Sequence, residues 1–260
     1  MKKFIKNIKK YFKYTIRMAK SELKSEVAGS RLNWLWWVIE PLCFMVVYTF
    51  VFTVVFTAVE EYFAAFVFIG LTIWEFFNRM VTGSVKLIDT HRNIVTKVYI
   101  PKYVLLLSKS FTYLFKLFIS FIIAFILMVA LDVPLKINIL YFVPIFIIYY
   151  IFTFGLSCII MHLGVYIEDL KNFTKIALRL LFYVSGVFYD IGVRLGGTLE
   201  NIMLNYNPIA FFLSETRNVI LYNLDPNYIN LSIWGGISLL LCIIGIHFIH
   251  KHENSYVKVI

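Results

Sequence analysis

The sequence predicts an all-α membrane protein with six transmembrane helices, an N-terminal amphipathic helix, a short cytoplasmic helix and re-entrant helices before the last span. Hydrophobic residues make up 60% of the 260 residues and charged residues only 15%, whereas a soluble domain is about half apolar and a quarter charged. Apolar runs of roughly 20 residues, the length that crosses a bilayer, recur along the chain. Basic residues lie between these runs, as in cytoplasmic loops.

Residues 1–30 are predicted to form a separate N-terminal interface segment. Between positions 2 and 20, apolar residues recur every three or four positions and lysines fill the opposite face. These apolar residues are Phe4, Ile5, Ile8, Tyr11, Phe12 and Ile16. The pattern favours an amphipathic helix that lies on the membrane surface and contacts membrane lipids. A solvated basic tail is the alternative.

Residues 31–260 are predicted to form a single transmembrane domain. The expected spans are about 34–58, 62–85, 110–131, 139–167, 173–191 and 228–249. Between the last two, the stretch 198–222 contains two segments too short to cross, which favours re-entrant helices. Asn207 followed by Pro208 is typical of a helix start, since Asn caps free amides and proline suits the first helical position.

The distribution of basic residues predicts that both termini are cytoplasmic. The loops after the second and fourth spans then lie on the same side as the lysine-rich N-terminal segment. The basic residues outside these segments are Lys116, Lys136, Arg194 and Arg217. Membrane topology therefore accounts for the net charge of +10, and nucleic-acid binding is not expected.

The sequence contains no recognisable catalytic centre. It has no GxxxxGK followed by Ser or Thr, the loop that holds nucleotide phosphates, so any ATP must be hydrolysed by another subunit. It also has no HExxH or GxSxG motif and no acidic cluster typical of a metal-dependent glycosyltransferase. We therefore expect no enzymatic activity, and no metal or other cofactor bound by this chain.

Glu75 and Arg79 lie four residues apart within the second expected span. An ionisable side chain inside a span is costly unless it is paired or faces an aqueous cavity. The two residues are therefore expected either to form an ion pair that fixes packing or to line a transport path. A proton-driven carrier would need acidic residues in several spans, and only Glu40 and Glu75 are available.

Aromatic residues make up 18% of the chain and are concentrated in the spans. Most of them must pack in the interior or face lipid, but an aromatic face can also stack on a sugar ring. The candidates to line a path together with Glu75 and Arg79 are Tyr48, Trp74, Tyr149, Phe152, Tyr183 and Phe188.

The cytoplasmic stretch from Lys86 to Lys97 mixes charged residues with apolar residues at helical spacing. It is longer and more polar than a connection between two spans requires. A short helix with a face for a partner protein is therefore favoured over a plain linker.

Four stretches of the sequence resemble segments of the permease subunits of type-2 ABC exporters for O-antigen, capsular polysaccharide and teichoic acid. Positions 30–42 are similar to the pattern RxLGxLWxxLxP at the first span, with Asn33 in place of Gly. Positions 98–105 are similar to VxFPxxxLP, and positions 181–189 resemble the fifth-span pattern. Asn207 to Arg217 resembles the element NPxxxxxxxxR of the re-entrant helices, so the resemblance covers nearly the whole chain.

The resemblance implies a homodimer in the bacterial cytoplasmic membrane that works with two copies of a separate ATP-binding subunit, which would hold ATP and Mg²⁺. The cargo would be a lipid-linked polysaccharide or teichoic-acid-like glycopolymer that enters near the N-terminal helix. The short cytoplasmic helix would be a coupling helix, which transmits force from the ATPase. The coupling contacts implied are Asp89, His91, Arg92, Lys97, Glu168, Asp169 and Lys171.

Two other functions stay open at this level. One is an ABC-type permease for a small molecule or a lipid, although permeases of that kind often carry a large extracellular domain, which is not evident here. The other is a membrane glycosyltransferase or acyltransferase of the same pathway. It would act without a partner and would need an acidic or histidine centre.

Overall fold

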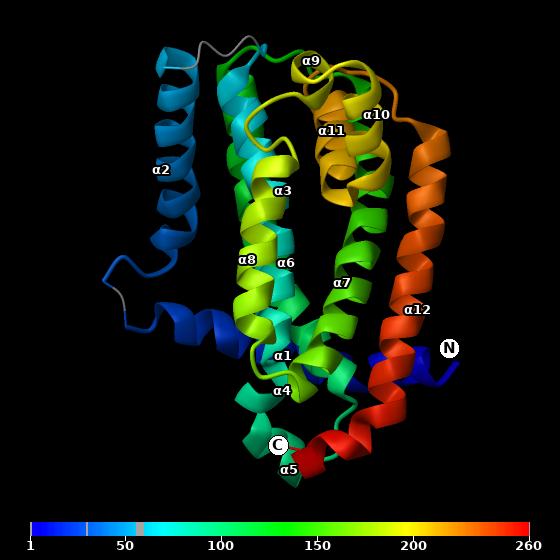
Figure 1. The fold of residues 1–260 in the computed structure, drawn as a ribbon. Coiled ribbons are helices and arrows are strands. Elements are labelled where there is room, and N and C mark those ends of the chain that lie inside the picture. Colours follow the sequence, from blue (N-terminus) through cyan, green and yellow to red (C-terminus); the bar gives the residue numbers. More distant parts are fainter. Residues whose placement is uncertain (1, 30, 56–59, 260) are drawn as a thin grey trace.

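The computed structural model describes residues 2–29, 31–55 and 60–259, which form helices joined by short connections (Figure 1). No strand occurs within these ranges, and the predicted all-α class is confirmed. The α-helices are α1 (Lys2–Val27), α2 (Trp36–Phe50), α3 (Phe63–Val85), α4 (Leu87–Thr90), α5 (Arg92–Lys97), α6 (Lys102–Ala130), α7 (Phe142–Tyr166), α8 (Leu170–Val184), α9 (Ile191–Arg194), α10 (Gly197–Tyr206), α11 (Pro208–Ile220) and α12 (Tyr228–Val259). Short 3-10 helices cover Asn33–Leu35 and Ile137–Tyr141, and a π-helix covers Val51–Val55.

Five stretches of the described residues are long and apolar enough to cross a membrane. They are Trp36–Val54, Phe63–Val85, Lys102–Ala130, Ile137–Tyr166 and Tyr228–Tyr256. These stretches correspond to the first four expected spans and to the last one. Positions 56–58, at the end of the first expected span, lie outside the described residues.

The expected fifth span, 173–191, is not confirmed as a crossing helix. The helix at this place, α8, has 15 residues, which extend about 22 Å, whereas the hydrocarbon core is about 30 Å thick. α8 ends at Val184, and the chain then turns at Gly186, whose φ is 70°. The path from the end of α7 to the start of α12 still runs from the lower to the upper end of the bundle, through α8 to α11 (Figure 1).

Two helices are longer than the sequence predicted, both at the lower end of the bundle in Figure 1. α6 begins at Lys102 rather than near position 110, and α12 continues well beyond position 249. The extension of α12 is polar, and the extension of α6 is bounded by Lys102 and Lys109, so the sequence assigns these segments to loops. Their polar groups have partners, because Lys109 pairs with Glu22 of α1 and the Tyr256 hydroxyl lies 2.7 Å from Nδ1 of His162 in α7.

The core of the bundle is built around α3, which is buried along most of its length. α7 lies beside α3 on one side and packs along α12 on the other. Gly155 of α7 allows the close approach to α12, because a Cβ at this position would lie 2.6 Å from the backbone nitrogen of Cys242. α2, by contrast, has no buried residue and stands at the edge of the bundle (Figure 1).

The predicted amphipathic N-terminal helix is confirmed and is longer than expected. α1 crosses the bundle near the end where both chain termini lie (Figure 1). It packs along the first turns of α6, where Asn7 donates a hydrogen bond of 3.0 Å to the Tyr103 hydroxyl. Phe12 and Ile16 stay exposed on its surface. The helix is therefore bound to the bundle on one side, and its contact with lipid stays a prediction.

The two helices expected within 198–222 are α10 and α11. Asn207 caps α11, since its side-chain oxygen accepts hydrogen bonds from the amides of Ile209 (3.1 Å) and Ala210 (3.2 Å). Pro208 occupies the first turn, as predicted. α11 is largely buried in the bundle, whereas α10 has no buried residue. The helix start at Asn207 is confirmed, and the re-entrant placement of the pair stays a prediction.

Candidate functional site

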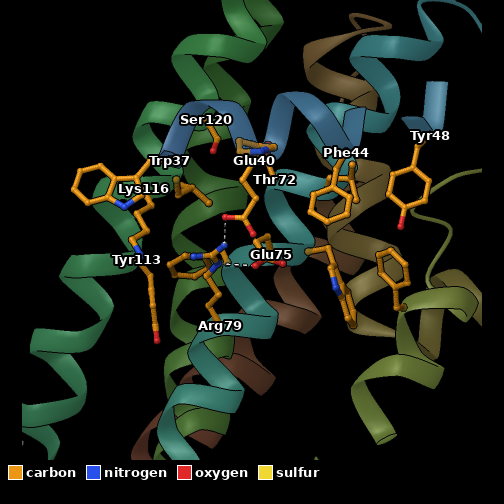
Figure 2. Close-up of a pocket in the computed structure, with 16 residues that line it drawn as sticks. Trp37, Glu40, Phe44, Tyr48, Thr72, Glu75, Arg79, Tyr113, Lys116 and Ser120 are labelled. Atoms are coloured by element: carbon orange, nitrogen blue, oxygen red, sulfur yellow. Dashed lines mark hydrogen bonds and ion pairs between the residues drawn. The ribbon is translucent and has the colours of Figure 1, made fainter. Parts of the chain in front are cut away.

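A cavity of about 210 Å³ lies where α2, α3, α6 and α8 meet (Figure 2). Its wall combines aromatic rings with charged side chains. The charged residues stand out because they lie on long helices that are otherwise apolar. The cavity is lined by Trp37, Glu40, Pro41, Phe44, Tyr48, Leu71, Thr72, Trp74, Glu75, Phe76, Arg79, Tyr113, Lys116, Leu117, Ser120 and Phe182. Because four helices contribute, the site exists only in the assembled bundle.

Arg79 occupies the centre of the charged part of the wall (Figure 2). Its Nε donates to Oε1 of Glu75 at 2.5 Å, and its Nη2 lies 3.5 Å from Oε2 of Glu40. Arg79 thus joins α2 to α3 and offsets two carboxylates. Glu75 and Arg79 therefore form the expected ion pair, and both also line the cavity.

Lys116 is the second cation of the cavity wall and comes from α6. Its Nζ lies 2.5 Å from Oε2 of Glu26 in α1, and 5.8 and 5.9 Å from the ring centroids of Trp37 and Tyr113. In Figure 2 these two rings and Lys116 lie on one side of the central ion pairs. The sequence contained a signal for Lys116, since it is an ionisable residue within a span, but its partner on α1 could not be foreseen.

The aromatic candidates Tyr48 and Trp74 line the cavity, as expected. Phe188 is buried beside it, with its ring centroid 4.3 Å from that of Tyr48. Phe182, which the sequence did not single out, lies between Trp74 and Phe188, and its ring centroid is 5.1 Å from the ring centroid of each. Tyr183 follows on α8 and is exposed. α2, α3 and α8 thus bring four of the expected aromatic residues into one region.

Tyr149 and Phe152, the other two aromatic path candidates, do not line this cavity. Both side chains are buried in the core on α7. The Tyr149 hydroxyl donates to the carbonyl oxygen of Ile73 at 2.7 Å, and the Phe152 ring packs against Trp234 of α12. α7 is apolar around its whole circumference, so its sequence pattern does not reveal which side faces the core.

The stretch from Lys86 to Lys97 forms α4 and α5, which project at the lower end of the bundle (Figure 1). Of its apolar residues, Leu87, Ile88 and Val95 are buried within this chain. Arg92 and Lys97 are exposed. Two further coupling candidates, Asp89 and His91, are half-buried. The exposed surface at this end combines these charges with the exposed side chains of Val98 and Tyr99, which follow α5.

The turn between α7 and α8 lies at the same end of the bundle as α4 (Figure 1). Its charged residues Glu168, Asp169 and Lys171 are all exposed. Lys86, which precedes α4, donates to the carbonyl oxygen of Gly164 near the end of α7 at 3.1 Å. The two groups of predicted coupling residues thus lie on neighbouring connections at one end of the molecule.

The C-terminal part of α12 also reaches this end. Tyr99, between α5 and α6, donates its hydroxyl proton to Oε1 of Glu253 at 2.8 Å. The hydrogen bond to Glu253 raises the pKa of Tyr99 to about 12, so the hydroxyl stays a donor at neutral pH. This contact ties the segment after α5 to the last helix.

Comparisons with known proteins place the chain among permeases. No protein-family model matches the sequence. An O-antigen export system permease protein of Myxococcus xanthus is 27% identical over 241 residues, which cover 93% of each chain. Two O-antigen export system permease proteins of Klebsiella pneumoniae are 23% and 26% identical over 255 and 257 residues, which cover 98% of this chain and 97% of theirs.

These relatives are matched from end to end, so the similarity concerns the whole chain and not one helix. Together with the five apolar helices, they identify a multi-pass membrane protein. The resemblance carried by the four sequence stretches is thereby confirmed, because the chain is similar over nearly its whole length to permease proteins of O-antigen export systems.

Proposed function

We propose that this chain is the transmembrane subunit of an ATP-driven ABC exporter that moves a lipid-linked polysaccharide or teichoic-acid-like glycopolymer across the bacterial cytoplasmic membrane. The observation that carries the proposal is the similarity to three O-antigen export permeases over 93% or more of this chain. The cavity supports it, because aromatic faces suit sugar rings while carboxylates and basic groups bind hydroxyls.

The motor of this exporter is a separate ATP-binding subunit that holds ATP and Mg²⁺, since the sequence has no phosphate-binding loop. The half-buried Asp89 and the exposed charges of Arg92, Lys97, Glu168, Asp169 and Lys171 form the docking surface, which we call the coupling surface. Closure of the ATPase pushes on α4 and α5. The movement reaches the bundle because the apolar residues of these short helices are buried in it.

Two copies of the chain enclose the path in this proposal. α2 has no buried residue, and α8 carries an exposed apolar stripe of Phe173, Ile176, Leu180 and Tyr183. Both helices border the cavity. A second copy that covers these faces would bury apolar surface and close the cavity on the side where a single chain leaves it open.

Reconstitution tests the proposal. The chain and its ATP-binding subunit are placed in vesicles, and transfer of a lipid-linked glycopolymer is followed by its accessibility to a glycosidase. Transfer is expected to need both subunits and ATP. Replacement of Asp89, Arg92 and Lys97 by Ala is expected to reduce transfer at least about tenfold, since several charge-assisted contacts at about 1.5 to 3 kcal/mol each are removed.

The matched control is Lys136→Ala, an exposed basic residue at the opposite end of the bundle, which is expected to leave transfer unchanged. Glycopolymer transfer by this chain without the second subunit, or normal transfer by the triple variant, would contradict the proposal. ATP-dependent transfer of a small dye but not of the glycopolymer would favour the small-molecule permease.

A further inference from the structure

A ladder of polar contacts holds α1 against the first half of α6. Lys109 pairs with Glu22, and the Thr112 hydroxyl also donates to Glu22 at 3.1 Å. Further along, Lys116 pairs with Glu26 in the last turn of α1. Each of the two lysines of α6 therefore forms an ion pair with a glutamate of α1. Lys116 also lines the cavity, whereas Lys109 does not.

Lys116 thus lines the cavity and also pairs with a residue of α1, which lies outside the cavity. Its carboxylate partner Glu26 is not a lining residue, and the Glu26 side chain is 33% exposed while that of Lys116 is 13% exposed. The carboxylate is able to exchange its partner for water at moderate cost. The ammonium has little access to water, so its charge is weakly screened and strongly attracts an acidic group.

The other cation of the cavity, Arg79, is already offset by two carboxylates, Glu40 and Glu75. An acidic ligand near Arg79 would have to compete with both. Near Lys116 it competes with Glu26 alone. The ion pairs with Arg79 also reduce the repulsion that Glu40 and Glu75 would exert on such a ligand. The position in the cavity that suits an anion is therefore the one beside Lys116.

We infer that Lys116 binds an acidic group of a ligand in this cavity, and that this group displaces Glu26 from the ammonium. Occupancy of the cavity then releases the last turn of α1 from α6. The inference rests on the proposed function, which supplies a cargo with a lipid anchor. It assigns to Lys116 a binding role and to α1 the role of an element that responds to cargo.

The test uses the full-length chain in nanodiscs of neutral phosphatidylcholine, with binding measured by isothermal titration calorimetry. The probes are farnesyl diphosphate, farnesol and inorganic pyrophosphate, which separate the acidic group from the tail. Farnesyl diphosphate is expected to bind at least about tenfold more tightly than farnesol, since a charge-assisted contact is lost without the phosphate. Hydrogen exchange of residues 20–27 is expected to increase when farnesyl diphosphate binds.

Three variants test whether Lys116 binds the acidic group directly. Lys116→Gln is expected to weaken farnesyl diphosphate binding at least about tenfold. Glu26→Gln is expected to strengthen it several-fold, because the competing carboxylate is removed. Lys109→Gln, the matched control, breaks an equivalent pair between α1 and α6 and is expected to change binding by less than about twofold.

A purely structural role of Lys116 makes a different prediction, namely that the Lys116, Lys109 and Glu26 variants all weaken binding alike. That pattern, equal binding of farnesol, or no binding of farnesyl diphosphate by the wild-type chain would overturn the inference. Pyrophosphate that binds as tightly as farnesyl diphosphate, with the same dependence on Lys116, would support the anion site and assign it to a soluble anion. ATP-dependent export is measured separately, so failure here leaves the proposed function intact.

Discussion

At the scale of single residues, Arg217 shows how a buried charge organises the backbone. Its guanidinium donates to the carbonyl oxygens of Phe66 at 3.2 Å, Gly186 at 2.7 Å and Val187 at 2.6 Å. It also lies 3.5 Å from the ring centroid of Phe66. The side chain thus joins α11, α3 and the turn after α8, where the carbonyl groups would otherwise lack donors. Arg217 explains structurally why the last part of the NPxxxxxxxxR element is basic.

Arg217→Met is expected to lower the free energy of unfolding by about 2 to 5 kcal/mol, because three buried carbonyl groups lose their donor. Unfolding of the purified chain by titration with SDS measures the change. The matched control is Arg179→Gln, which removes an exposed arginine of α8. The control is expected to change stability by less than about 1 kcal/mol. Equal effects of the two variants would contradict the structural role of Arg217.

At the scale of elements, α7 and α12 show which residues decide the side on which two apolar helices pack. The expected length of each helix follows from hydropathy, but both are apolar on all sides over most of their length. The contact face is set by small residues. A Cβ on Gly155 would lie 2.6 Å from the backbone nitrogen of Cys242, and a Cβ on Gly245 would lie 2.8 Å from the carbonyl oxygen of Gly155. Dispersion contacts between closely spaced backbones then hold the pair together.

Gly155→Ala is expected to destabilise the chain by about 1 to 3 kcal/mol, since the added methyl group must push α12 away. Gly236→Ala is the matched control in α12, because a Cβ there meets no atom within 4 Å. It is expected to leave stability unchanged or to raise it by up to about 1 kcal/mol through helix propensity. The same SDS titration measures both. A Gly155 variant as stable as the Gly236 variant would show that the close crossing is not needed.

At the scale of the whole molecule, both termini lie toward the lower end of the bundle, the N-terminus beside α12 and the C-terminus near α4 and α5 (Figure 1). Five apolar helices alone would place the termini on opposite sides. The additional passage is made by α8 and the short helices that follow, which reach the upper end without a helix of crossing length. The predicted topology, with both termini on one side, therefore does not require six long spans.

Labelling of single cysteines tests this topology. In a chain whose Cys43, Cys158 and Cys242 are replaced by Ala, Asn93→Cys on α5 and Leu224→Cys before α12 are both at exposed positions. They are expected to react with a membrane-impermeant maleimide from opposite sides of the membrane. Sealed vesicles of both orientations provide the measurement. Reaction of both cysteines from the same side would contradict the arrangement.

The sequence by itself determined the local features of this protein. Apolar runs placed the five long helices, and the recurrence of apolar residues every three or four positions within 2–20 identified α1. Both signals could be found because hydropathy and periodicity depend only on residues that are close in the sequence. Asn207 and Pro208 marked the start of α11 for the same reason, since a cap satisfies amides within one turn. Glu75 and Arg79 could be paired because they lie on adjacent turns of one helix.

Only the tertiary structure decided which distant residues meet. The pairing of Lys116 with Glu26, the place of Glu40 beside Arg79 and the burial of Tyr149 all depend on how whole helices pack. The turn after α8 is likewise contacted by a distant residue, since Arg217 of α11 donates to the carbonyl oxygen of Gly186. In a chain this apolar, most helix faces are equally suited to lipid and to protein, so the sequence pattern leaves the contact faces open. Close backbone crossings and compensated charges then select one arrangement.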